Sequence, residues 1–301
     1  MNDIQIDAKL GVKTFFVLPE LSLIPEEYLK CFFMKGFETY FLEDDPYYTL
    51  EVKIHSLFSL FPEVILFFNI DREVHDIDWP LFIGALQNKY QERAKIGVLY
   101  RKRNNVEEIK KLERLYLYDI GIVCGCIPIE YQKAKNLFLI LNVLIANQAN
   151  GQRKFLRAIC DETCKLNFMF HGTKYQGYIR DISISHFSCV FTGDSPALFV
   201  NEKISDIQLS LKGSILKIDG ICGLKRVMGN EQIHIFVFRN ENAKDGLNPE
   251  QLLKINSFIF SLFLQSVNAL LKIEYGTIEA VLGKKKERGI SPKTTISQTV
   301  A

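Results

Sequence analysis

The feature that most constrains the fold of this chain is a regular alternation of apolar runs and helical segments over residues 1–147. Each short apolar run is typical of a buried strand, and the segment after it carries apolar residues at helical spacing. The five runs are Val12–Leu18, Phe37–Leu42, Val64–Ile70, Ala94–Tyr100 and Ile122–Ile127. The five helical segments are Ile24–Gly36, Leu50–Leu60, Trp79–Tyr90, Asn105–Tyr118 and Tyr131–Asn147. Five β–α units in a row predict an α/β domain with a doubly wound, parallel five-stranded sheet, most simply of flavodoxin-like strand order.

The pattern changes after a small polar joint at Gln148–Gln152. Beyond it the apolar segments are short and alternating, and glycines separate them. Such spacing predicts an antiparallel β-barrel or sandwich. The expected strands are Ala158–Cys160, Lys165–Phe170, Tyr175–Asp181, Ser188–Phe191, Asp206–Leu211, Ser214–Gly223 and Gln232–Arg239.

A C-terminal helix is expected after the last of these strands. Asn248 suits the N-cap, Pro249 the first helical position, and Gln251 completes a pattern like a capping box. We therefore divide the chain into an α/β domain at 1–147, a joint at 148–157, a barrel with its C-terminal helix at 158–282, and a tail at 283–301. The tail has a basic run and little apolar content, so we expect it to be disordered.

Charge and cysteine usage bear on the class of protein and its compartment. The chain has 37 Lys+Arg and 35 Asp+Glu, which does not fit a polycation that coats nucleic acid. Residues 1–147 hold 17 basic and 21 acidic residues, a net of −4, so the total of +2 hides an acidic first half. The seven cysteines form no framework, and the first ten residues do not resemble a secretory signal. These points favour the reducing cytoplasm.

Leu252–Leu271 is long enough to span a membrane. It contains Lys254, Asn256, Gln265 and Asn268, whose side chains are costly in lipid. We therefore expect a buried helix here and no transmembrane segment.

Two local motifs accompany the barrel pattern. Arg153-Lys154-Phe155-Leu156-Arg157 is an R-x-x-x-R directly before the first barrel strand, and Asp181-Ile182-Ser183 is a D-x-S at the end of a later strand. In this order and at this distance, the pair resembles the PilZ domain, and Leu216–Ile221, with its central Gly220, is similar to an alternating strand of that family. The resemblance covers roughly residues 150–272. It implies a small antiparallel barrel with a C-terminal helix that binds cyclic di-guanosine monophosphate, c-di-GMP.

By that resemblance, the ligand-binding residues are Arg153, Arg157, Asp181 and Ser183, with Gly220 near the ligand. The chemistry fits: an arginine fork meets phosphate oxygens or the O6 and N7 of guanine, and an ionised carboxylate accepts from guanine N–H groups. Family members that bind a stacked ligand dimer often carry an arginine where this chain has Gln152, so a monomeric ligand is favoured. The alternatives are that the two arginines are a solvated pair at a joint, and that Asp181 and Ser183 only close a turn.

The sequence departs from the family pattern D-x-S-x-x-G at one position, because His186 replaces the glycine. Glycine permits positive φ and close backbone approach, whereas histidine projects a ring. The loop is therefore expected to be shaped differently, or ligand affinity to be reduced.

The first half resembles a response-regulator receiver by its pattern alone. Receivers carry a phosphorylated aspartate at the end of the third strand. Here that strand ends in Phe68-Asn69-Ile70, where Asn69 cannot form an acyl phosphate, and Asp71 lies further on. Only Glu20 follows the first strand as an acid, Arg101 follows the fourth strand, and Pro128 lacks the preceding lysine of receivers. Magnesium needs converging oxygen ligands and phosphoryl transfer needs cations. The chain therefore looks like a pseudo-receiver that serves interaction or dimerisation.

Other constellations are weak. Cys160 and Cys164 with His171 do not have zinc-finger spacing, and the acidic loop around His75 is expected to be solvated. Cys124 and Cys126 alternate along an expected strand and fit small core residues. Nucleotide-binding glycine loops and a nucleophile elbow are both missing, so we expect no enzyme, no metal and no cofactor. Lys284–Lys286 is expected to be part of a solvated tail.

The leading hypothesis is a bacterial second-messenger receptor in which c-di-GMP orders the joint and changes the angle between the domains. It would signal to an unidentified protein partner of the motility, adhesion or envelope machinery, and no nucleic acid is expected. One alternative is a PilZ-like scaffold that binds no ligand. A regulator phosphorylated on Asp71 is the other.

Overall fold

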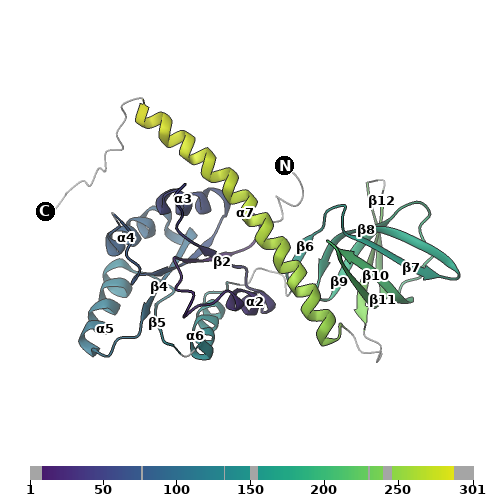
Figure 1. The fold of residues 1–301 in the computed structure, drawn as a ribbon, viewed down its shortest axis with the longest axis horizontal. Coiled ribbons are helices and arrows are strands. Elements are labelled where there is room, and N and C mark those ends of the chain that lie inside the picture. The colour runs from purple at the N-terminus through teal and green to yellow at the C-terminus, as the bar shows by residue number, and fades with distance from the viewer. Residues whose placement is uncertain are drawn as a thin grey trace.

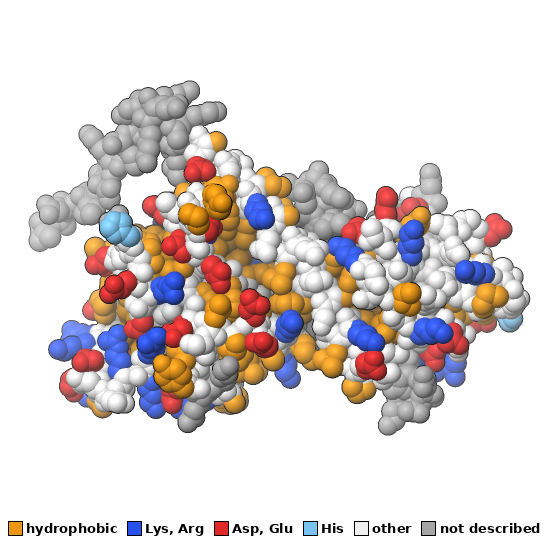
Figure 2. All heavy atoms as spheres, in the orientation of Figure 1, with side chains coloured by type: hydrophobic (Ala, Val, Ile, Leu, Met, Phe, Trp, Pro, Cys, Tyr) orange, Lys and Arg blue, Asp and Glu red, His pale blue; other side chains and the backbone are white. Residues whose placement is uncertain are grey.

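The computed structural model describes residues 9–75, 77–131, 133–149, 155–229, 231–239 and 246–287. Two domains lie side by side, and one long helix crosses both (Figure 1). The first is an α/β domain and the second is an antiparallel barrel, as the sequence predicts. Acidic and basic side chains are interspersed over both domains on the face that Figure 2 shows.

The α/β domain is built on five parallel strands in the order β2-β1-β3-β4-β5, which confirms the flavodoxin-like prediction. The strands are β1 (Lys13–Val17), β2 (Thr39–Leu42), β3 (Val64–Asn69), β4 (Ala94–Arg101) and β5 (Cys126–Ile129). The helices are α2 (Glu27–Met34), α3 (Leu50–Leu60), α4 (Trp79–Tyr90), the short η1 (Gln91–Arg93), α5 (Val106–Glu113), which continues as the π-helical turn η2 (Arg114–Ile120), and α6 (Lys133–Ala146).

The last strand of this sheet begins later than predicted. The expected run Ile122–Ile127 is a strand only from Cys126, because Gly125 adopts a φ of 79° that breaks extended backbone. Cys124 is buried as expected, but Cys126 is half-buried, so the two do not share the same core position. Burial raises the pKa of both thiols to about 12, which keeps them protonated.

Alternation along the strands sends apolar side chains to both faces of the sheet. Phe16, Ile65 and Phe67 pack with α2 and α6 on one face. Phe15, Leu66 and Phe68 pack with α3, α4 and α5 on the other. All six side chains are fully buried, which is why these strands read as continuous apolar runs.

The barrel closes through six antiparallel strands in the cyclic order β8-β7-β10-β11-β12-β9, and a short strand, β6, pairs with the end of β8. Its interior is a cluster of Phe, Ile and Leu side chains with Cys189 and Cys222. The strands are β6 (Arg157–Ile159), β7 (Lys165–Phe170), β8 (Thr173–Ser183), β9 (His186–Phe191), β10 (Lys203–Leu211), β11 (Ser214–Met228) and β12 (Glu231–Arg239).

Helix α7 (Pro249–Glu287) begins where predicted and with the predicted cap. The backbone N–H of Gln251 donates to Asn248 Oδ1 at 2.9 Å, and the Asn248 N–H donates to Gln251 Oε1 at 3.0 Å. The helix is longer than expected, since it runs past Leu271 and into the first residues of the expected tail. Residues 288–301 of that tail lie outside the described part of the chain.

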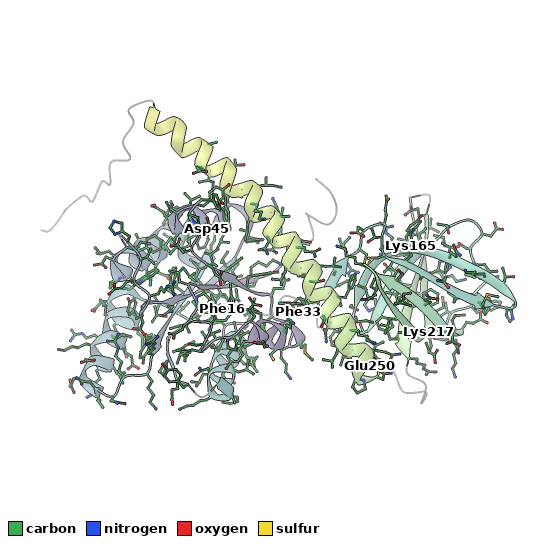
Figure 3. All side chains as sticks on the ribbon, viewed as in Figure 1. Phe16, Phe33, Asp45, Lys165, Lys217 and Glu250 are labelled. Atoms are coloured by element: carbon green, nitrogen blue, oxygen red, sulfur yellow. The ribbon has the colours of Figure 1, made fainter. Side chains whose placement is uncertain are left out.

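Helix α7 packs on both domains, a contact that the sequence analysis did not foresee. Phe33 of α2 meets Phe260 and Phe263 of α7, each with ring centroids 5.3 Å apart (Figure 3). Further along, the Tyr275 ring packs against Tyr48 at a tilt, with ring centroids 5.2 Å apart, and Glu274 accepts a hydrogen bond from Ser59. One helix therefore completes the barrel and covers the α/β domain.

Pro249–Ala280 is long and apolar enough to cross a membrane by length and composition. In this structure, however, Ile255, Ile259 and Val267 are at most 1% exposed and lie in the protein core. The apolar character of the helix is accounted for by packing between the domains.

Candidate ligand-binding site on the barrel

Arg157 and Asp181 come together on the outer face of the barrel. Strand pairing sets Arg157 opposite Ser183, with Ala158 opposite Ile182. Ala158 and Ile182 point into the core, so alternation turns their neighbours outward. Arg157 Nη1 lies 3.7 Å from Asp181 Oδ1, close enough for an ion pair but too far for a hydrogen bond.

Both charged groups hold polar atoms that are buried without a hydrogen-bond partner among the described residues. These atoms are Nε of Arg157 and Oδ1 of Asp181. A buried polar group without a partner costs about 1–3 kcal/mol, and such groups are rare in folded proteins. Arg157 therefore offers a hydrogen-bond donor and Asp181 a hydrogen-bond acceptor, and neither atom is used by the described residues.

Ser188 holds the other oxygen of the aspartate. Its hydroxyl donates to Asp181 Oδ2 at 2.6 Å across the β8–β9 ladder, where the two residues are partners. Ser188 was not predicted from the sequence, because only the register of β8 on β9 places it opposite Asp181. The hydrogen bond fixes the carboxylate so that Oδ1 faces Arg157.

Ser183 closes the turn between β8 and β9. Its hydroxyl accepts from the backbone N–H of His186 at 3.2 Å and donates to the His186 carbonyl at 3.0 Å. The His186 ring lies within hydrogen-bond distance of Ser183 and Ser185, with Nδ1 at 3.2 and 2.8 Å from their hydroxyl oxygens. Ser183 is 1% exposed, so in this structure it supports the loop.

His186 begins β9 with ordinary backbone, since it is not among the described residues with positive φ. The missing glycine therefore leaves no strain at this position. Burial lowers the pKa of His186, Asp181 opposes that change and Arg157 adds to it. The imidazole is thus neutral at pH 7 and lies beside the Arg157–Asp181 pair.

Gly220 is not in contact with these residues. It pairs with Phe238, whose N–H donates to the Ser185 carbonyl, so it lies two strands away, about 10 Å. A Cβ at Gly220 would point at Ile207 in the core, only 3.0 Å from its Cδ1. Packing against Ile207 therefore explains why a glycine stands at position 220.

Two predicted binding residues, Gln152 and Arg153, lie outside the described residues. The segment after them touches three parts of the molecule. Phe155 and Leu156 line a small cavity with Phe33 and Met34 of α2, Ile259 of α7 and Ile184 of the β8–β9 turn. The residues beside Arg157 and Ser183 thus take part in the junction between the domains.

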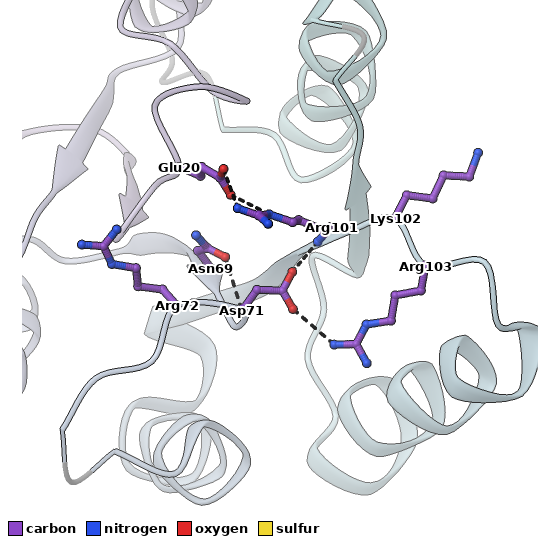
Figure 4. A pocket seen from close by; sticks show the side chains of 7 residues that line it. All are labelled: Glu20, Asn69, Asp71, Arg72, Arg101, Lys102 and Arg103. Atoms are coloured by element: carbon purple, nitrogen blue, oxygen red, sulfur yellow. Dashed lines mark hydrogen bonds and ion pairs between the residues drawn. The ribbon is translucent and has the colours of Figure 1, made fainter.

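The α/β domain does not assemble the oxygen cluster of a phosphorylation site. Asp71 follows β3, and its carboxylate accepts from the Arg101 backbone N–H and from Arg103 at 3.2 Å (Figure 4). Glu20 is held by both Arg101 Nε and Nη2, at 2.9 and 2.7 Å. Guanidinium groups occupy the surroundings of both carboxylates, and among the described residues three or more potential metal ligands gather nowhere.

Cys160 and Cys164 are buried, and neither belongs to such a cluster. A hydrogen bond to Cys164, together with burial, raises the pKa of Cys160. Seven cysteines are free in this structure.

Neither a family model nor a curated protein matches the sequence. Among solved structures, the barrel matches the c-di-GMP-bound PilZ domain of YcgR from Escherichia coli, at 14% identity, over 39% of this chain and 96% of that one, with a TM-score of 0.33. It also matches MrkH of K. pneumonia in complex with c-di-GMP, at 14% identity over 39% and 55% of the chains, with a TM-score of 0.34.

A third match is the Bacillus subtilis inhibitor of motility MotI, at 8% identity over 38% and 52% of the chains, with a TM-score of 0.31. The chain thus spans nearly all of the isolated YcgR domain but about half the length of the other two proteins. These matches lie in the barrel, where the sequence analysis expects a PilZ domain.

Proposed function

We propose that this chain is a receptor for c-di-GMP, which binds on the outer face of the barrel at Arg157 and Asp181. The observation that carries the proposal is the pair of buried, unsatisfied polar atoms on the two motif residues. A ligand with guanine and phosphate groups supplies what both lack. Guanine N–H groups would donate to Asp181 Oδ1, and Arg157 would donate to a phosphate or to the O6 and N7 of guanine.

The proposal also includes the remaining motif residues. Arg153 would add a second arginine from the joint, and Ser183 with His186 would hold the β8–β9 turn against the ligand. Gln152 favours one ligand molecule per chain. The protein would act by binding and not by catalysis, in the cytoplasm, and it would signal to an unidentified protein partner of the motility, adhesion or envelope machinery.

Coupling between ligand and domain arrangement is part of the proposal. Phe155, Leu156 and Ile184 adjoin the binding residues in sequence and also meet α2 and α7. A ligand that reorders these segments would shift the packing of the barrel on the α/β domain, provided that it prefers one arrangement. Small-angle scattering of the full chain, with and without saturating c-di-GMP, measures that change.

Calorimetric titration of the full chain with c-di-GMP tests the binding. We expect binding at a ratio near one, and a loss of at least about tenfold in affinity in Arg157→Ala, because charge-assisted hydrogen bonds are removed. Arg180→Ala is the matched control, since Arg180 neighbours Asp181 on β8 but pairs with Glu231 at 3.1 Å. Its affinity should change less than about twofold.

Two outcomes would overturn the proposal. If the wild-type chain gives neither heat nor a thermal shift at tens of micromolar c-di-GMP, the protein is not a receptor for this ligand. If in addition His186→Gly gains binding, the natural chain is the scaffold that binds no ligand. Undiminished binding by Arg157→Ala would instead place the site elsewhere.

A further inference from the structure

A second cavity lies at the carboxyl edge of the parallel sheet, far along the chain from the barrel motif. It has a volume of about 440 Å³, within the range of small-molecule sites. Glu20 follows β1, Asn69 ends β3 with Asp71 and Arg72 after it, and Arg101–Arg103 spans the end of β4 and the residues after it. Because β1 and β3 are neighbours and their connections leave in opposite directions, this edge is the topological switch point of the sheet. Ligands of open α/β sheets bind at such points.

The lining is basic inside an acidic domain. Four basic residues, Arg72 and Arg101–Arg103, face two acidic ones, Glu20 and Asp71, so the lining carries a net +2. The domain as a whole carries −4, from 17 basic and 21 acidic residues over 1–147. A positive cavity in a negative domain selects for an anion.

The carboxylates do not make this a cation site. Both oxygens of Glu20 receive hydrogen bonds from Arg101, and both oxygens of Asp71 receive hydrogen bonds from Arg101 and Arg103. A metal ion would have to displace the guanidinium donors and the Arg101 backbone N–H, which donates to Asp71 Oδ2. Arginines of the lining therefore neutralise its two carboxylates, and the charge that remains is positive.

Arg72 supplies that surplus. Its guanidinium has no hydrogen bond or ion pair among the described residues, and it extends on the other side of Asn69 from Arg101 (Figure 4). Lys102, in contrast, extends away from Asp71 and pairs with Glu130 at 3.0 Å. An unengaged planar fork in a cavity is the group that recognises a phosphate with two parallel hydrogen bonds.

We propose that this cavity binds a small phosphate-bearing molecule, with Arg72 as its principal ligand and Arg101 as a second donor shared with Glu20. The site is separate from the proposed c-di-GMP site. The phosphate group, free or carried by a nucleotide, is the part that the arginines recognise.

Calorimetric titration of the full chain with inorganic phosphate, pyrophosphate, AMP and GMP tests the inference. At least one probe should bind, and preference for pyrophosphate or for a nucleotide tells whether the source is a free phosphate or a nucleotide. Arg72→Ala should weaken that probe by about tenfold or more, and Arg72→Lys should weaken it less, because the charge remains and the fork is lost. Lys102→Ala is the matched control and should change affinity less than about twofold.

A variant with the opposite sign sharpens the test. Glu20→Gln removes a carboxylate that competes for Arg101 and repels the anion, so the probe should bind several-fold more tightly. Glu107→Gln is its control, because Glu107 pairs with Lys110 at 3.3 Å and neither residue lines the cavity, so this change should leave affinity unchanged. Arg157→Ala should weaken c-di-GMP binding by at least about tenfold and leave the phosphate probe unaffected, which separates the two sites. The inference is overturned if none of the four probes binds at millimolar concentration, or if Arg72→Ala binds as well as the wild-type chain.

Discussion

At the scale of single residues, close approach between strands is the tightest constraint in the barrel. Gly177 of β8 lies opposite Phe191 of β9, and a Cβ there would come within 2.3 Å of the Val190 carbonyl oxygen. Backbone atoms cannot yield as a flexible side chain can. The barrel can therefore close between β8 and β9 only because residue 177 is a glycine, which has a hydrogen atom where other residues have Cβ.

We expect Gly177→Ala to destabilise the protein by about 3 kcal/mol or more, since the added methyl group forces two paired strands apart. Gly84→Ala is the matched control. Gly84 lies within α4, and a Cβ there would meet nothing within 4 Å, so this change should stabilise the helix by about 0.5–1 kcal/mol. Urea unfolding of the two variants measures both effects. Equal stability of the two would contradict the packing argument.

His234 is fully buried in the barrel, edge-on to Phe191 at 4.9 Å, and neither ring nitrogen has a hydrogen-bond partner among the described residues. Burial lowers its pKa, and Lys225 adds to the effect. The ring is therefore neutral when folded, but it titrates near pH 6.5 in the unfolded chain. The contribution of the neutral His234 to the free energy of unfolding is fully present above about pH 6.5. It is lost as the pH falls below that value, by at most about 1.4 kcal/mol per pH unit for one histidine.

We expect a lower Tm at pH 5.5 than at pH 7.5, and a smaller difference in His234→Phe. His186, whose pKa is also lowered, accounts for part of what remains. The carboxylates with lowered pKa, such as Asp45 and Glu51, lose their contribution only at lower pH, so they do not act in this window. Thermal melts of the wild type and variant check the prediction. An unchanged pH difference in His234→Phe would show that another group is responsible.

At the scale of the elements, the spacing of apolar residues predicted nearly all of the helices and strands. Each helix or strand buries one side, and the residues on that side recur at the period of that element. β5 was misplaced because the run Ile122–Ile127 is continuous in hydrophobicity, and only the conformation of Gly125 divides it. The end of α7 was misplaced because the apolar run Leu252–Leu271 is by itself long enough for a helix that closes the barrel. Nothing local in the sequence shows that Tyr275 has a partner in Tyr48.

The candidate sites divide in the same way. The motif residues Arg157, Asp181 and Ser183 were singled out because two short local motifs carry them and together resemble the PilZ domain. Ser188 and the cavity at Arg72 could not, since they depend on the β8–β9 register and on the order of strands in the parallel sheet. Such contacts are long-range, and one sequence carries no direct signal for them.

At the scale of the whole molecule, α7 joins the two hydrophobic cores. Phe260 and Phe263 are 8% exposed and share Phe33 of the other domain, while Val267 and Leu271 lie in the core of the α/β domain. The two domains should therefore unfold together, because neither keeps its core intact without the helix.

We expect Phe260→Ala with Phe263→Ala to destabilise the protein by several kcal/mol and to split one calorimetric transition into two, since each change empties a buried aromatic site. Leu253→Ala is the control, because Leu253 lies on the same helix but is 57% exposed. It should shift stability by no more than about 0.5 kcal/mol. A single transition with an unchanged Tm in the double variant would show that the domains are not coupled through this helix.

The position of α7 in the chain has a consequence for biosynthesis. The α/β domain emerges from the ribosome first, but the helix that covers α3 and Phe33 is translated only after all seven strands of the barrel. Domains generally fold as they emerge, N-terminal first. This one must wait with an apolar face uncovered until the last helix is made, so the nascent chain, and not the finished protein, is the form most exposed to aggregation and to capture by chaperones.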